Sequence, residues 1–231
     1  MGELIMKAKS TMPVKVASLI IAAVNFAVAL LMTLRLPETV PIHFNADWVC
    51  DNTGSRYVAL LTAALPFLVA AALFFSDHFT KESNRKVTLI TVIIMELYFV
   101  ALHWITYPLY ASGVTVGEQT DPQAVSWALP LLMSVLFVMI GNYLPVVQPN
   151  HTLGIRVKWT LEDENCWQMT HRFAGRLWVI TGLITAAAII VLMALHVPAE
   201  LWIFIVLGEL FTAAVAVPTI YAYLHRKEEQ A

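Results

Sequence analysis

Charged residues are scarce in this chain. Of its 231 residues, 14 are Lys or Arg and 16 are Asp or Glu, which is about half the charged fraction of an ordinary soluble domain. Hydrophobic residues make up 59% of the sequence and fall into long uninterrupted blocks. A water-soluble globular protein is therefore excluded. The net charge of -2 also gives no basic field, so we expect no direct binding of nucleic acid.

Sequence motifs of catalysis are missing as well. The chain has no His-Glu-x-x-His, no Gly-x-Ser-x-Gly, no phosphate-binding glycine loop and no paired Cys motif. We therefore expect neither an enzyme nor a cofactor. Only two cysteines occur, Cys50 and Cys166, and the topology derived below puts them on opposite sides of a membrane. A disulfide within one chain is not expected, because the two thiols cannot meet.

Apolar runs of 19 to 24 residues predict six membrane-spanning helices in an all-α, polytopic membrane protein. We treat residues 1–231 as a single membrane domain, a bundle of six helices. The predicted spans are Val16 to Leu34, Tyr57 to Phe75, Val87 to Tyr110, Ala124 to Val147, Leu177 to Leu195 and Leu201 to Leu224.

The distribution of Lys and Arg predicts the orientation, because short loops rich in these residues stay in the cytoplasm. Twelve of the 14 basic residues fall at the two termini or in alternate loops: Lys7, Lys9, Lys15, Lys81, Arg85, Lys86, Arg156, Lys158, Arg172, Arg176, Arg226 and Lys227. The other loops hold only Arg35 and Arg56, and acidic residues such as Glu200. Both termini are therefore expected in the cytoplasm.

Polar residues inside the predicted spans suggest a polar seam through the bundle. Glu96 and Glu209 fall near the bilayer midplane, and Asn25 shares that depth. Glu96, His103 and Tyr107 lie on one face of the third helix, because they are seven and four residues apart. Two interpretations stay open. In the first, the seam has a function, either as a relay for protons or ions, which would make the chain a small coupled transporter or channel, or as a pocket for a small cationic or peptide group. In the second, it is a set of hydrogen bonds that joins helices.

The first external loop, residues 36–56, has an unusual composition for a plain connector. Two prolines stiffen it, and the sequence from Asp51 to Gly54 is typical of a turn. Pro41, His43, Asn45 and Asp51 are candidates for a rigid external recognition site. We expect no metal site, because zinc usually needs several His or Cys ligands and this loop has one of each.

The long cytoplasmic loop, residues 148–176, combines basic and aromatic residues. Thr160 followed by three acidic residues predicts a short interfacial helix from about Leu161 that leads into the fifth span. The basic and aromatic side chains suit either an anchor at the lipid phosphates or a docking surface for a cytosolic protein. Small residues at four-residue spacing, namely Gly182 with Ala186 and Gly208 with Thr212 and Ala216, predict close helix packing.

These two loops resemble the SdpI family, the immunity proteins named for resistance to the sporulation-delaying-protein toxin. The resemblance rests on L-P-x-x-V-P-x-H-F-N...D-x-x-G-S-R at residues 36–56 and on P-N...G-I-R...W-T-L...W...T-H-R...G at residues 149–175. It implies a multi-pass protein of the bacterial inner membrane that protects its host from a secreted membrane-active peptide toxin. It also implies a second role, sequestration of a cytosolic winged-helix repressor at the membrane.

A sensor-to-output arrangement follows from this resemblance. Pro41, His43, Asn45 and Asp51 would form the external sensor for the toxin. The polar seam would comprise Asn25, Glu96, His103, Tyr107 and Glu209. The cytoplasmic output would comprise Asn150, Gly154, Arg156, Trp159, Thr160, Trp167, His171 and Arg172. The partners expected are the lipid bilayer, the peptide toxin and the repressor.

Overall fold

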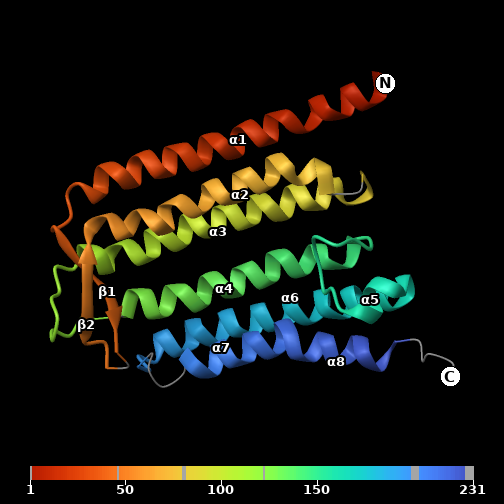
Figure 1. Cartoon of the computed structure of the whole chain (residues 1–231). Helices are drawn as coiled ribbons and strands as arrows, with labels where there is room; N and C mark the ends of the chain where they lie inside the picture. Colours follow the sequence, from red (N-terminus) through yellow and green to blue (C-terminus); the bar gives the residue numbers. More distant parts are fainter. Residues whose placement is uncertain (1, 46, 80–81, 122, 199–202, 227–231) are drawn as a thin grey trace. The chain divides into compact units, whose positions relative to one another are not determined.

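The computed structural model describes residues 2–45, 47–79, 82–121, 123–198 and 203–226 (Figure 1). It is mostly helical. The long helices are α1 (Gly2–Thr33), α2 (Ala59–Phe79), α3 (Arg85–Ala111), α4 (Gln123–Tyr143) and α6 (Glu164–Ala194); α5 (Lys158–Glu162), α7 (Ile203–Phe211) and α8 (Val217–Leu224) are shorter. The strands β1 (Thr39–Phe44) and β2 (Cys50–Ser55) form one antiparallel hairpin. Single 3₁₀ turns occupy Arg56–Val58, Glu82–Asn84 and Leu144–Val146 (η3).

The predicted spans agree with the helices that are long and apolar enough to cross a membrane. Within the described residues there are six such helical segments: Thr11–Thr33, Arg56–Ser76, Glu82–Ala111, Val125–Val146, Glu164–Ala194 and Val206–Leu224. Residues Lys81, Glu200, Leu201 and Lys227, which entered the predictions above, lie outside the described residues. The prediction of six membrane-spanning helices is therefore confirmed at this level.

Helix α1 shows why these helices need a lipid environment. Its buried positions recur every three or four residues and carry polar or small side chains: Thr11, Lys15, Ser18, Ala22, Asn25, Ala29 and Thr33. Its large apolar side chains, among them Ile20, Val24 and Leu31, are exposed. A soluble helix has the opposite arrangement, so the exposed face of α1 is suited to hydrocarbon. At one end of the buried stripe, Lys15 Nζ donates to the carbonyl of Phe74 in α2 at 3.2 Å.

The chain divides into two compact units. Unit 1 comprises Met1–Phe75 and Met95–Val125, and therefore holds α1, the hairpin, most of α2 and the second part of α3. Unit 2 comprises Ser76–Ile94 and Ser126–Ala231, and holds α4 to α8. The assignment of residues 1–231 to one membrane domain stays a prediction.

Close helix packing in unit 2 depends on three glycines. A Cβ on Gly175 would lie 2.7 Å from the carbonyl oxygen of Gly141, and one on Gly182 would lie 2.7 Å from that of Ser134. These distances are too short for a side chain, so α4 and α6 meet through their backbones. The packing role predicted for Gly182 is confirmed. The apolar core beside it contains Phe137, Ile189, Val206 and Leu210.

The sixth span is not one regular helix. A π-helical turn at Thr212–Ala216 separates α7 from α8. This turn changes the face on which later residues fall, so the spacing of Gly208, Thr212 and Ala216 does not form a packing stripe. A Cβ on Gly208 would meet nothing within 4 Å. The packing role predicted for Gly208 is therefore wrong.

The short helix before the fifth span exists, but its start differs from the prediction. Helix α5 begins at Lys158, and Thr160 lies inside its first turn, where its Oγ1 accepts from the amide of Val157 at 3.1 Å. The helical conformation is interrupted at Asp163, whose carboxylate caps α6 by accepting a hydrogen bond from the amide of Asn165 at 2.9 Å. The acidic run therefore marks the start of α6, and Thr160 is not its cap. The expectation of an entirely helical chain also fails at the β1–β2 hairpin.

Candidate functional site

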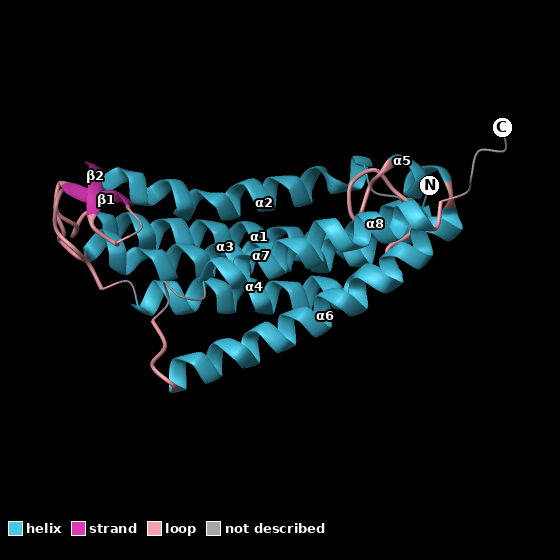
Figure 2. Ribbon diagram, turned by 90° about the horizontal axis from the view of Figure 1, so that it is seen from below, coloured by secondary structure: helices cyan, strands magenta, loops and turns pink. Residues whose placement is uncertain are grey.

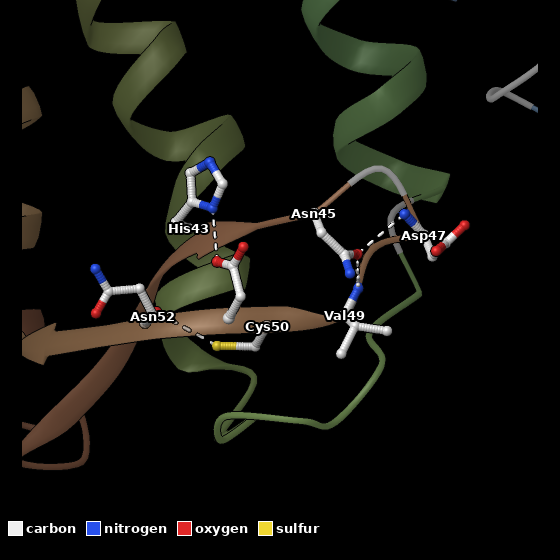
Figure 3. A network of polar contacts seen from close by, with 7 residues as sticks. His43, Asn45, Asp47, Val49, Cys50 and Asn52 are labelled. Atoms are coloured by element: carbon white, nitrogen blue, oxygen red, sulfur yellow. Dashed lines mark hydrogen bonds and ion pairs between the residues drawn. The ribbon is translucent and has the colours of Figure 1, made fainter.

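The candidate site in the first predicted loop is a β-hairpin with two irregularities. Its register pairs Pro41 with Thr53, His43 with Asn52 and Phe44 with Cys50, and the shifts on either side of His43 are β-bulges. Bulges change the direction of neighbouring side chains. Here they bring His43 Nδ1 to 2.6 Å from Asp51 Oδ1 (Figure 3).

Asn45 closes the hairpin turn. Its side-chain oxygen accepts from the amides of Asp47 at 3.0 Å and Val49 at 2.9 Å (Figure 3). Its backbone amide donates to the carbonyl of Val49 at 3.0 Å. Asn45 is therefore a structural residue of the turn, because it replaces backbone hydrogen bonds that the sharp bend removes. Pro41 is buried beneath the hairpin. Of the four predicted sensor residues, His43 and Asp51 are the two that present charged or titratable side chains to solvent.

The loop between α3 and α4 holds the hairpin from its other edge. The amide of Cys50 donates to the carbonyl of Glu118 at 2.9 Å, and the amide of Gly117 donates to the carbonyl of Cys50 at 2.8 Å. The Glu118 carboxylate accepts from the amide of Thr115 at 2.7 Å, a hydrogen bond that lowers the pKa of Glu118. Cys50 itself is a buried free thiol. The strands β1 and β2 and the α3–α4 loop therefore form one hydrogen-bonded unit, which the sequence did not predict.

Arg56 is a site residue that sequence reasoning missed, although it ends the first motif. Its Nη1 donates to the carbonyls of Leu36 at 3.0 Å and Leu34 at 3.3 Å, just after the end of α1. Its backbone amide donates to the carbonyl of Glu38 at 3.0 Å. Arg56 therefore joins the end of α1 to the start of α2 and fixes the base of the hairpin, as a cation at a helix C-terminus can do.

The surface that the hairpin offers is polar and accessible. The His43 side chain is 67% exposed and that of Asp51 is 45% exposed, so the pair can exchange its mutual contact for one with a ligand. Within the described residues, no three His, Cys, Asp or Glu side chains are close enough to share a metal ion. The pair can donate and accept hydrogen bonds.

The predicted polar seam is divided between the two units. In unit 1, Asn25 Nδ2 donates to the carbonyl of Ala63 at 3.1 Å and its oxygen accepts from Trp104 Nε1 at 3.0 Å. His103 Nδ1 is 2.9 Å from Thr62 Oγ1. The Tyr107 hydroxyl donates to the carbonyl of Met32 at 3.2 Å. These contacts connect α1, α2 and α3 in the manner expected of polar groups that join membrane helices.

The two acidic residues of the seam differ in their surroundings. Glu96 is completely buried beside the hydroxyl of Ser18 in α1, and its carboxyl oxygens form no well-oriented hydrogen bond with a described residue. Glu209 belongs to unit 2, where its side chain is exposed while the neighbouring Leu210 packs in the core. Equal depth in the sequence therefore does not give the two carboxyl groups equal environments.

The 148–176 segment folds around a small buried network. Asn150 Oδ1 accepts from the amides of Thr152 at 2.8 Å and Leu153 at 2.7 Å, and its amide nitrogen donates to the carbonyl of Gln148 at 2.7 Å. Thr160 Oγ1 donates to the carbonyl of Ile155 at 2.8 Å. Both side chains are buried. Asn150 and Thr160 thus hold the loop in one conformation, which is a structural role.

Trp167 and His171 of α6 form hydrogen bonds with the backbone at and next to the same loop. Their rings stack with centroids 4.0 Å apart, and Trp167 Nε1 donates to the carbonyl of Val147 at 2.8 Å. His171 Nδ1 donates to the carbonyl of Trp167 at 2.8 Å, while Nε2 accepts from the amide of Ile155 at 3.0 Å. Only the neutral imidazole with its proton on Nδ1 satisfies both bonds. Gly154 passes so close that a Cβ there would collide with His171 Nε2.

The exposed part of this segment is basic and aromatic. Arg156 and Arg172 are exposed, and Arg156 Nη1 donates to the carbonyl of His151 at 2.6 Å. Trp159 meets Tyr223 of α8 edge to face, with ring centroids 5.5 Å apart, so that α5 lies beside α8 (Figure 2). Of the eight predicted output residues, Arg156 and Arg172 are thus the fully exposed charges, and most others build the fold that presents them.

The fold and these loops define a multi-pass membrane protein. Residues 146–222 match the SdpI/YfhL protein family, and residues 20–69 match a domain of unknown function, DUF1648. The immunity protein SdpI of Bacillus subtilis (strain 168) is 22% identical over 181 residues, which cover 74% of this chain and 79% of that protein. No solved structure matches. These matches confirm the resemblance to the SdpI family that the two loop motifs predict.

Proposed function

We propose that this chain is an immunity and signalling protein of the bacterial inner membrane that gives resistance to a secreted membrane-active peptide. The similarity to the immunity protein SdpI of Bacillus subtilis over three quarters of the chain carries this proposal. The family match at residues 146–222 includes the whole 148–176 segment, and the match at residues 20–69 includes the hairpin. In both loops, side chains form hydrogen bonds with backbone groups of the same loop and so order it.

In this proposal the hairpin faces the exterior and the 148–176 segment faces the cytoplasm. The Lys and Arg distribution supports that orientation, because basic residues gather in the loops on one side. The His43–Asp51 pair then meets the peptide, and the exposed Arg156 and Arg172 meet a cytosolic winged-helix repressor. Short helix α5 lies at the inner membrane interface, where Trp159 suits the headgroup region.

The first test is protection of a sensitive bacterium. Cells that express the chain should survive a challenge with the sporulation-delaying peptide. His43→Ala should lower survival, because Asp51 then loses the imidazole with which it pairs on the hairpin. Thr39→Ala, an exposed position in the same strand, is the matched control and should protect fully. Arg156→Ala should reduce recruitment of the winged-helix repressor to the membrane. Lys86→Ala removes an equal charge elsewhere and should not reduce it.

The outcomes separate the two halves of the proposal. Survival unchanged by the wild-type gene would remove the immunity function. A fluorescent winged-helix repressor that stays in the cytosol after toxin addition would remove the signalling function and leave immunity standing. Membrane localisation of every variant is measured alongside, so that loss of protein is not mistaken for loss of function.

A second candidate function is a small proton- or ion-coupled transporter or channel. One observation favours it: the Glu96 carboxyl group is completely buried and forms no well-oriented hydrogen bond among the described residues, an arrangement costly enough to suggest a role for the group. Purified protein in proteoliposomes should then pass protons or ions, and Glu96→Gln should abolish the flux with folding intact. Thr181→Val, which removes a buried hydroxyl of α6 outside the seam, is the control for lost polarity and should leave the flux unchanged. Absence of flux in the wild type would reject this candidate.

A further inference from the structure

A shallow groove lies in unit 2 where α4 and η3 meet α6. It encloses about 240 Å³. The lining residues are Gly141, Asn142, Pro145, Gly175, Arg176, Val179 and Ile180. Gly175 and Arg176 belong to the end of the 148–176 segment, but the proposed immunity function assigns no role to this groove.

The groove exists because two glycines remove side chains at the crossing. A Cβ on Gly141 would lie 2.8 Å from Trp178 Cβ, and one on Gly175 would lie 2.7 Å from Pro145 Cδ. The backbones therefore approach closely, and the ring of Pro145 and the side chain of Val179 form apolar walls. Asn142, Arg176 and Ile180 are exposed at the rim.

The position of the groove along α6 is set by Arg176. It is the last charged residue before the uncharged stretch from Leu177 to Ala194, whose exposed side chains include Ile180, Leu183 and Ile184. Arg176 therefore lies at the boundary between the polar and apolar surfaces of the helix, which is the depth of lipid phosphates in a bilayer. No hydrogen bond or ion pair joins its guanidinium to another described residue, so its donors are available.

We propose that this groove binds one anionic phospholipid, such as phosphatidylglycerol. Arg176 would donate to the phosphate, Asn142 would add a neutral hydrogen bond, and an acyl chain would lie against Pro145, Val179 and Ile180. The charge of Arg176 complements the phosphate, and the apolar walls below it continue into the hydrocarbon-facing surface of α6. The groove is lined by seven residues, whereas each side of a stable protein interface contributes about 20 to 30, and one lipid chain needs only a narrow apolar channel.

The test measures lipid retained by the full-length protein. Protein extracted with equal amounts of phosphatidylglycerol and phosphatidylcholine is analysed by native mass spectrometry. The wild type should retain phosphatidylglycerol preferentially, and Arg176→Gln should reduce that retention about five-fold, the effect of one basic side chain at an anionic surface. Lys86→Gln, an equal loss of charge outside the groove, should have no effect. Val179→Trp should fill the groove and reduce retention of both lipids.

Several results would overturn the proposal. Equal retention of the two lipids by the wild type, or equal behaviour of Arg176→Gln and Lys86→Gln, would reject a phosphate site. Displacement of the signal by excess inorganic phosphate would assign the site to a free anion. Unchanged retention in Val179→Trp would place the lipid elsewhere. If Arg176→Gln unfolds, Arg176→Lys replaces it: because the charge is kept, a continued preference for phosphatidylglycerol supports the phosphate site, and equal retention of the two lipids rejects it.

Discussion

Single residues in the 148–176 segment act chiefly through conformation. Gly154 has φ of +114°, a region that residues with a side chain rarely adopt, and His171 occupies the space where its Cβ would be. His171 also accepts a hydrogen bond from the amide of Ile155, the residue that follows Gly154. The glycine, the histidine and the loop therefore depend on one another, and this explains why these residue types occur together in the motif.

Gly154→Ala should destabilise the protein by about 2–4 kcal/mol, because backbone strain and a collision with His171 add. The midpoint of thermal unfolding in detergent measures the effect. Gly113→Ala is the matched control: Gly113 also has positive φ, at +71°, but a Cβ there meets nothing within 4 Å. It should cost only about 1–2 kcal/mol. Equal costs for the two variants would show that His171 does not hold the loop.

At the scale of elements, local sequence patterns predicted helices well and caps poorly. The apolar blocks correctly predict α1 to α4 and α6. A long apolar segment must be helical in hydrocarbon, because a helix forms all its backbone hydrogen bonds within the segment. The hairpin was not predicted, since its strands are short and interrupted by Pro41 and Gly54. Its pairing depends on the α3–α4 loop, which is distant in sequence. The π-helical turn in the sixth span likewise has no local signal.

Arg56 is the residue that connects two elements at the hairpin base. Arg56→Gln should lower the free energy of unfolding by about 1–3 kcal/mol, because the carbonyls of Leu34 and Leu36 lose a charged donor. Arg35→Gln, a neighbouring exposed arginine, should change it little. Chemical denaturation in detergent gives both values. A larger loss for Arg35→Gln would contradict the capping role.

At the scale of the whole molecule, the orientation in the membrane is the prediction on which the functional proposal depends. The native cysteines are poor reporters, because Cys50 and Cys166 are both buried. Exposed positions serve better. Glu38→Cys should react with a membrane-impermeant maleimide in intact cells, and Glu162→Cys should react only after permeabilisation. The unmodified chain is the background control. The reverse labelling pattern would invert the sensor and output assignments.

The sequence by itself determined the class of protein and the number of spans. Both follow from composition and run length, because hydrocarbon admits only long apolar helices and penalises charge wherever it occurs. Tertiary structure decided which polar residues build the fold and which are presented. Asn45, Asn150 and Thr160 form hydrogen bonds within their own loops, His43 and Arg156 are exposed, and Glu96 and Glu209 have different surroundings. Burial and hydrogen bonding depend on which segments a side chain meets, and that information lies between elements distant in the chain.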